Sequence, residues 1–193
     1  MCKFIALRGI KAFRLTRLIM EKAQDPVEMQ NEFDKMDGTR MLLTVLSESN
    51  TSLIANDLPL NFLTFGVTIL DEGNTRVQQT IFHYCQNFQR SEMMFAKFNI
   101  IISEEIQRLN SRNEIGHDEL QSLILENTLR FLQLFTEGHY LDLQNYIRQQ
   151  TNSRTNYDMV SLTVELLRSY HRHMNEKTYE NIVKCLDTLN EFV

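Results

Sequence analysis

Glu137 has the most distinctive chemical setting in this sequence. It follows an apolar stretch, LRFLQLFT, and precedes Gly138, so the sequence predicts an apolar helix that ends at this carboxylate. The last turn of a helix carries partial negative charge on unpaired carbonyl groups. An acid there is therefore unfavourable by up to ~1 kcal/mol unless a cation offsets it. We expect a positive charge close to Glu137.

The sequence contains none of the common catalytic motifs. GxSxG, HExxH, P-loop and GxGxxG patterns are all missing, which argues against nucleophilic, zinc-hydrolytic and nucleotide-dependent chemistry. His171 and His173 are two residues apart and would point to different faces of a helix, so a shared metal is disfavoured. His83 and His139 are isolated, which is more typical of packing or hydrogen bonding than of metal binding. We predict no enzymatic activity.

The three cysteines, Cys2, Cys85 and Cys185, show no paired spacing. An odd number of cysteines without CxxC spacing supports neither a disulfide framework nor a zinc site. We expect free thiols in a reducing compartment.

The composition predicts an all-α fold. Hydrophobic residues make up 42% of the 193-residue chain, with only 6 Gly and 2 Pro, and helix-favouring residues are abundant. Apolar periodicity and capping residues divide the chain into about ten helices with short connections. Asp25 followed by Pro26, Asn74, and Asn175 each predict a helix start. Several helices are apolar on more than one side, which favours an armadillo/HEAT-like solenoid over the alternative, a compact bundle.

The charge is unevenly distributed. The net charge is −5, yet the first twenty residues contain five basic residues and no acid, so the remainder is acidic, which argues against a nucleic-acid partner. The first helix, from about residue 2 to 22, has an apolar side that includes Phe13 and Leu18. It could lie on an anionic membrane, but we favour an ordinary solenoid helix.

A transmembrane segment is not predicted. The longest uncharged stretch, LPLNFLTFGVTIL from Leu58 to Leu70, is shorter than the ~18–20 apolar residues needed to span a bilayer. It also contains proline, asparagine and glycine. We therefore predict a buried core helix.

Three sequence blocks carry a resemblance to a known family. They are TFGVTILDEGNTRVQQTIFHYCQ from Thr64, LRFLQLFTEGHYLDLQNYIRQQT with the following TNYDMV, and MNEKTYENIVKCLDTLNEF near the end. In this order they resemble the domain shared by inositol trisphosphate receptors and ryanodine receptors, which are tetrameric calcium release channels of the endoplasmic reticulum. The TNYDMV block is closer to the inositol trisphosphate receptor. The resemblance also implies a solenoid fold.

The resemblance implies a calcium site. Glu137 in the FTEGH block and Glu191 in the LNEF block match the two carboxylates with which these channels bind activating calcium. Calcium takes ~6 to 8 oxygen ligands, so two carboxylates leave most of its coordination open. In the family, the other ligands come from the C-terminal segment linked to the pore. We therefore expect the isolated chain to bind calcium with low affinity.

The resulting prediction is a regulatory segment of an inositol trisphosphate receptor-type channel at the cytosolic face of the endoplasmic reticulum. Its partners would be the rest of the channel tetramer, especially the C-terminal segment linked to the pore. Inositol trisphosphate would not bind here, because the resemblance places its site far upstream and no Arg/Lys cluster lies in the matched region. The alternative is a free-standing solenoid that binds protein partners. Alone, the chain would be soluble and cytoplasmic.

The predicted organisation is a basic helix at 1–24, a first solenoid half at 25–110 and the homology-associated region at 111–193, with a hinge near 110–118. The last helix has a regular apolar stripe that is still in progress at Val193, which suggests a fragment or truncated product. The stripe consists of Tyr179, Ile182, Val183, Leu186, Leu189 and Val193.

Overall fold

The computed structural model describes residues 2–48, 58–111 and 119–193. Over these ranges the chain forms ten α-helices and no strand, which confirms the predicted all-α solenoid. The proposed hinge at 110–118 lies almost entirely outside the described residues. The helices are α1 (Cys2–Met20), α2 (Pro26–Lys35), α3 (Gly38–Glu48), α4 (Leu58–Leu70), α5 (Thr75–Asn87), α6 (Ser91–Asn110), α7 (Glu119–Thr136), α8 (Leu141–Arg148), α9 (Met159–Arg172) and α10 (Glu176–Glu191), with a 3-10 turn, η2, at Asp71–Gly73.

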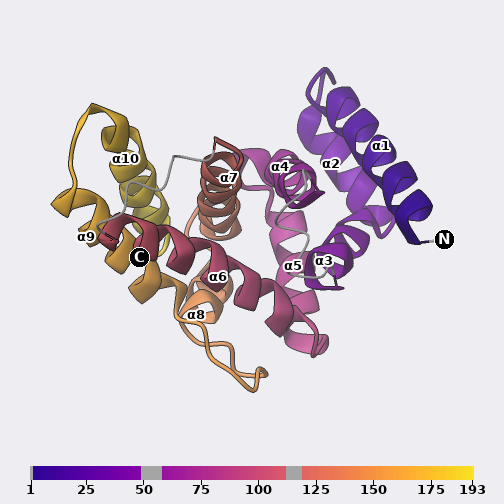
Figure 1. The fold of residues 1–193 in the computed structure, drawn as a ribbon. Helices are drawn as coiled ribbons and strands as arrows, with labels where there is room; N and C mark the ends of the chain where they lie inside the picture. The colour runs from indigo at the N-terminus through magenta and orange to yellow at the C-terminus, as the bar shows by residue number, and fades with distance from the viewer. Residues whose placement is uncertain (1, 49–57, 112–118) are drawn as a thin grey trace.

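The helices repeat in groups of three. α1, α4, α7 and α10 pack side by side as a row of first helices, α2, α5 and α8 form a row of second helices, and α3, α6 and α9 form a row of third helices. Figure 1 shows the stack as a curved row with α1 and α2 at one end and α9 and α10 at the other. The described residues thus form three repeats and the first helix of a fourth.

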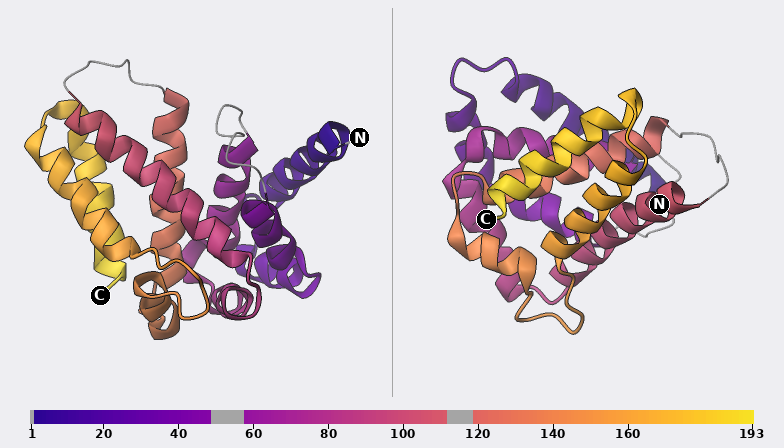
Figure 2. Two further views of the ribbon diagram at one scale, coloured as in Figure 1. Left: turned by 60° about the horizontal axis from the view of Figure 1, so that its bottom comes forward. Right: turned by 90° about the vertical axis from the view of Figure 1, so that its left-hand side faces the viewer.

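Neighbouring first helices run parallel. Lys184 of α10 contacts Glu126 of α7, and Thr188, one turn further along α10, lies beside the carbonyl oxygen of Leu129. Residue numbers therefore increase in the same direction along both helices. Figure 2 shows the row from two further directions. The C-terminal ends of α7 and α10 consequently point to the same side of the molecule.

Local capping fixes the helix starts that the sequence predicts. The Asp25 carboxylate accepts a hydrogen bond from the Glu28 backbone N–H at 2.9 Å, and Pro26 is the first helical residue. The Asn74 side chain accepts from the backbone N–H groups at the start of α5, and the Asn175 side chain does the same for α10. These interactions need only residues within three positions of the cap, so the sequence alone suffices to predict them.

A glycine allows the first helices to approach closely. Gly66 of α4 faces the Phe131 ring of α7, and a Cβ atom at position 66 would lie only 2.7 Å from that ring. Phe65, Ile69 and Phe131 are buried in the same core. The predicted core helix at 58–70 is thus confirmed, and no described helix is both long and apolar enough to cross a membrane.

The first helix packs as part of the solenoid. Phe13 and Met20 are buried, and the Phe13 ring lies against Phe62 and Phe65 of α4. The predicted apolar side was wrong at one position, because Leu18 is 46% exposed. The packing of α1 against α4, rather than the sequence pattern of α1 alone, determines which face of α1 is buried.

Two cysteines are free and buried. Cys85 and Cys185 form no disulfide, and burial raises the pKa of both thiols, that of Cys185 to about 12. A thiol with a raised pKa stays protonated near neutral pH. The structure therefore gives both side chains a packing role.

Candidate functional site at the helix C-termini

Three buried glutamines bind the C-terminal ends of the first helices. Gln30 of α2 donates to the carbonyl oxygens of Thr68 and Asp71, at 2.9 and 3.3 Å, where α4 ends. The three glutamines are Gln30, Gln78 of α5 and Gln144 of α8, and each is at most 4% exposed. Their donors satisfy backbone carbonyl groups that the end of a helix leaves without partners.

The same arrangement recurs in the next two repeats. Gln78 of α5 donates to the carbonyl oxygens of Leu134 and Glu137, both at 2.9 Å, where α7 ends. Gln144 of α8 donates to the Glu191 carbonyl oxygen at 2.9 Å, where α10 ends. In each case the second helix of one repeat binds the first helix of the following repeat.

The glutamine contacts define equivalent positions. Asp71, Glu137 and Glu191 are the last residues whose backbone carbonyls accept these bonds at the ends of α4, α7 and α10. All three carry a carboxylate. The two acids singled out from the sequence are therefore corresponding residues of adjacent repeats, and Asp71 is a third member that the sequence did not reveal.

Arg130 supplies the positive charge that the sequence led us to expect near Glu137. Its guanidinium lies 3.7 Å from the Glu137 carboxylate and also 3.7 Å from that of Asp71. Arg130 thus stands between the corresponding acids of two adjacent repeats. Its charge offsets the partial negative charge that the C-terminal end of α7 presents to Glu137.

One oxygen of Glu137 is shielded from solvent. Glu137 Oε2 is buried and has no hydrogen-bond partner among the described residues, although the Arg130 guanidinium lies near it. Gly73 also lies close to this side chain, because a Cβ atom at position 73 would come within 3.2 Å of Glu137 Cγ. A buried carboxylate oxygen without a hydrogen bond is costly unless a cation or donor approaches it.

The basic residue that corresponds to Arg130 in the next repeat behaves differently. Arg130 precedes Glu137 by seven positions, and Lys184 precedes Glu191 by the same spacing. Lys184 contacts the Glu126 carboxylate at 2.9 Å. Its charge is therefore directed toward the middle of α7 rather than toward the acids at the helix ends.

Glu191 lies half-buried at the end of α10. Its carboxylate is 3.4 Å from the Asn190 side-chain amide, while its backbone is held by Gln144. The Gln144 amide is also 3.5 Å from the ring of His139, two residues beyond Glu137. Gln144 therefore links the chain just beyond α7 to the end of α10.

The donor set suits only part of a calcium site. Glu137 fits a cation ligand because its shielded Oε2 has no hydrogen bond, and Glu191 adds a carboxylate at the corresponding position. Within the described ranges, no cluster of three or more His, Cys, Asp or Glu residues could hold a metal ion. Further oxygen ligands would have to come from outside these residues.

The sequence did not indicate Gln78, Gln144 or Arg130. A QN or QQ pair occurs near the start of each second helix, at Gln30, Gln78 and Gln144, and is the one signal that could have identified the repeat. Such a pair is too common to be informative alone. Only the stacked structure shows that these pairs occupy corresponding positions in the repeats.

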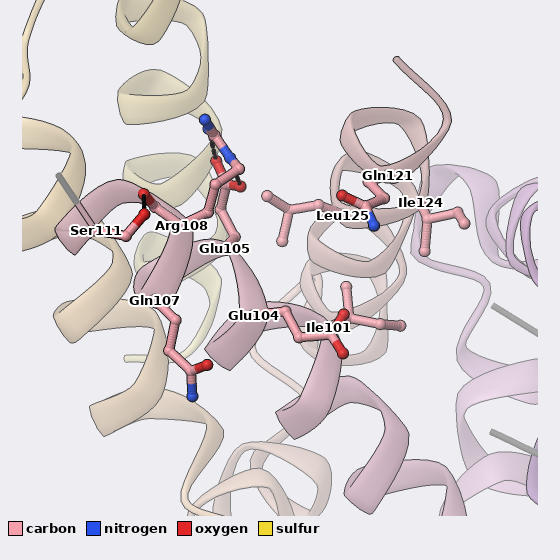
Figure 3. Close-up of a pocket in the computed structure, with 9 residues that line it drawn as sticks. All are labelled: Ile101, Glu104, Glu105, Gln107, Arg108, Ser111, Gln121, Ile124 and Leu125. Atoms are coloured by element: carbon pink, nitrogen blue, oxygen red, sulfur yellow. Dashed lines mark hydrogen bonds and ion pairs between the residues drawn. The ribbon is translucent and has the colours of Figure 1, made fainter. Parts of the chain in front are cut away.

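A separate groove of about 420 Å³ lies between α6 and α7. Figure 3 shows Leu125 of α7 pointing toward α6, where Glu105 and Arg108 form an ion pair. The Glu105 carboxylate also accepts a hydrogen bond from Tyr170 at 2.7 Å, and burial together with Glu105 raises the pKa of Tyr170. These polar groups satisfy one another, which indicates a structural role in joining α6 to α9.

A comparison with known families matches the second half of the chain. Residues 119–193, which comprise α7 to α10, match the family model described as RyR and IP3R Homology associated. The matched region includes both Glu137 and Glu191. This match supports a relationship to the ryanodine and inositol trisphosphate receptor family over these residues.

Proposed function

We propose that this chain is a regulatory solenoid segment of an intracellular calcium release channel of the inositol trisphosphate receptor type. In this role Glu137 and Glu191 contribute carboxylates to the activating calcium site. The segment has no catalytic activity and does not bind inositol trisphosphate. It works at the cytosolic face of the endoplasmic reticulum as part of the channel tetramer.

The relation between Glu137 and Glu191 carries this proposal. The two acids end adjacent parallel helices at corresponding positions, and Gln78 and Gln144 hold their backbones. The shielded oxygen of Glu137 has no hydrogen bond in the described structure, and Lys184 is paired elsewhere. Because these contacts hold the backbone at both acids, little backbone conformational entropy is lost when a cation binds.

A bound calcium ion would bridge the solenoid and the pore-linked C-terminal segment of the channel. Glu137 and Glu191 would provide two of its ligand groups, and the pore-linked C-terminal segment would provide the others. A ligand shifts a conformational equilibrium only if it binds one state more tightly. The closed and open channel would therefore differ in how closely that segment approaches the ends of α7 and α10.

Calcium binding tests this proposal. The chain is joined to the pore-linked C-terminal segment of an inositol trisphosphate receptor, and calcium affinity is measured by isothermal titration calorimetry. We expect Glu137→Gln and Glu191→Gln each to weaken binding by about tenfold or more, the loss of about one charged ligand. Glu165→Gln is the control, because Glu165 is an exposed acid in the middle of α9.

The control should leave the affinity within about twofold of the original chain. Equal affinity in the original chain and both glutamate variants would rule out the calcium role. In that case the alternative, a solenoid that binds protein partners without channel activity, would be preferred. The groove between α6 and α7 favours this alternative, because its walls combine apolar side chains with the exposed acid Glu104.

A further inference from the structure

Arg130 contacts two acids through different atoms of its guanidinium group. Its Nη2 atom lies 3.7 Å from Asp71 Oδ1, and its Nη1 atom lies 3.7 Å from Glu137 Oε2. Both distances are too long for a direct hydrogen bond, so Arg130 is not committed to either acid. Because each acid meets a separate nitrogen atom, the guanidinium can leave one acid and keep the other.

Glu137 is the acid for which Arg130 and calcium would compete. Glu137 Oε2 is buried without a hydrogen-bond partner among the described residues, and it is the atom that Arg130 approaches. A calcium ion bound to this carboxylate would lie within a few ångströms of the guanidinium, and like charges at such a separation repel. Arg130 therefore has to withdraw from Glu137 when calcium binds.

Asp71 offers Arg130 a second partner. The Asp71 side chain is 61% exposed, whereas that of Glu137 is 31% exposed. Within the described ranges, Asp71 has no ion pair other than the one with Arg130. An exposed side chain can rotate to follow the guanidinium at little cost. The contact with Asp71 is thus still available to Arg130 after a cation has taken its place at Glu137.

The turn that carries Asp71 is itself held close to Glu137. The Asp71 carbonyl oxygen accepts a hydrogen bond from Gln30 at 3.3 Å, and Gly73 of the same turn lies beside the Glu137 side chain. α4 and α7, which η2 and Arg130 belong to or adjoin, pack side by side (Figure 1). The backbone of η2 therefore places the Asp71 carboxylate beside Arg130 without burying it.

The next pair of first helices lacks this arrangement. Lys184 of α10 has the position that corresponds to Arg130, but it contacts the Glu126 carboxylate at 2.9 Å. In the part of the chain that the structure describes, Arg130 is accordingly the basic residue that forms an ion pair with Glu137. Any calcium ion that binds Glu137 would have to compete with it.

We propose that Asp71 is a positioning residue of the calcium site, which acts by holding Arg130 away from Glu137 when calcium is bound. This inference rests on the proposed calcium role of Glu137. In the calcium-free chain the guanidinium is shared between the two acids, and in the calcium-bound chain it pairs with Asp71 alone. The ion pair lost at Glu137 is then partly replaced at Asp71, so calcium binds more tightly than it would without Asp71.

A double-mutant cycle tests this role. Calcium affinity is measured by isothermal titration calorimetry on the joined chain described above, with Asp71→Asn, Arg130→Gln and both substitutions together. We expect Asp71→Asn to weaken calcium binding by about two- to fivefold, because Arg130 then pairs with Glu137 alone. In the Arg130→Gln background the same substitution should change the affinity by less than about 1.5-fold, because its effect passes through Arg130.

Two further variants at this turn serve as controls. Glu72→Gln removes the same charge from the adjacent exposed residue, which forms no ion pair within the described residues, and should leave the affinity within about 1.5-fold. Asp71→Glu keeps the charge and should stay within about twofold of the original chain. An equal loss from Asp71→Asn with and without Arg130 would overturn the proposal, since Asp71 would then act on calcium directly. Unchanged affinity in Asp71→Asn would also overturn it.

Glu137→Gln separates failure of this inference from failure of the proposed function. If Glu137→Gln weakens calcium binding while the effect of Asp71→Asn does not depend on Arg130, only the role of Asp71 is wrong. If Glu137→Gln leaves the affinity unchanged, both proposals are wrong.

A measurement without calcium tests the sharing of Arg130 directly. Urea denaturation of the chain gives the coupling between Arg130 and Glu137 from the variants Arg130→Gln, Glu137→Gln and their combination. We expect this coupling to be larger in chains that also carry Asp71→Asn, because Arg130 then has one partner instead of two. An equal or smaller coupling would show that Asp71 does not compete for Arg130 and would overturn the proposal.

Discussion

The side-chain amide of Gln78 donates a hydrogen bond to the backbone carbonyl oxygen of Glu137 at 2.9 Å. Gln78 and Glu137 belong to different repeats. The bond caps the C-terminal end of α7, next to which the candidate calcium ligand Glu137 lies. Gln144 makes the corresponding contact to Glu191. The position of each carboxylate therefore depends on a glutamine in the preceding repeat.

Replacing Gln78 with leucine should destabilise the fold. The substitution leaves the carbonyl groups of Leu134 and Glu137 buried without their donor, and we expect a loss of about 2 kcal/mol in the free energy of unfolding. Urea denaturation followed by circular dichroism measures this loss. Gln79→Leu is the control, because Gln79 is the adjacent residue on the same helix and is exposed. Equal effects at both positions would show that the Gln78 contacts contribute nothing specific.

Gly73→Ala should cost more than Gly138→Ala. Both glycines have positive φ angles, 65° and 75°, so alanine is strained at either position by about 1 kcal/mol. At Gly73 the added Cβ atom would also lie 3.2 Å from Glu137 Cγ, whereas at Gly138 it would meet nothing within 4 Å. The difference between the two variants in thermal denaturation isolates the contact with Glu137. No difference would mean that Glu137 moves away freely.

Lys97 should make stability depend on pH in the alkaline range. Burial lowers the pKa of Lys97 to about 8, and its amino group donates to the carbonyl oxygens of Leu46 and Ser47. Between about pH 8 and 10 the unfolded chain holds this proton more tightly than the folded chain, so the Lys97 contribution to stability rises with pH.

The comparison variant is Lys97→Met, which keeps the length of the side chain and cannot titrate. Urea denaturation at pH 7, 8, 9 and 10 should show that the original chain gains stability relative to the variant above pH 8. Below pH 8 the difference between them should be constant. A difference that stays constant over the whole range would contradict the lowered pKa.

Removing Arg130 should strengthen calcium binding if Glu137 is a ligand. The guanidinium lies 3.7 Å from the Glu137 carboxylate and repels an incoming cation. Arg130→Gln in the joined chain used for the titrations above should raise the calcium affinity by about two- to tenfold, because the charge is partly screened by solvent. Arg154→Gln, at an exposed position on the α8–α9 loop, is the control. An affinity that falls in Arg130→Gln would argue that Arg130 positions Glu137 instead of opposing calcium.

Residues close in the sequence allowed the helices to be predicted. Asp25, Asn74 and Asn175 were identified as caps because a capping side chain contacts backbone groups only two or three positions away. The glycine after Glu137 marked the end of α7 for the same reason. The composition and the apolar periodicity were sufficient to predict an all-α fold, and the family resemblance, together with helices apolar on more than one side, favoured a solenoid.

The sequence by itself determined the helices, the acid at the end of α7 and the need for a cation beside it. Only the tertiary structure decided that Arg130 is that cation, that Asp71, Glu137 and Glu191 correspond, and that Ile182 and Leu189 of α10 pack against the core while Tyr179 and Leu186 are exposed. Caps and periodicity depend on neighbours along the chain. The other features depend on how repeats separated by loops of unequal length stack, and side-chain periodicity cannot specify which face of a helix the next repeat covers.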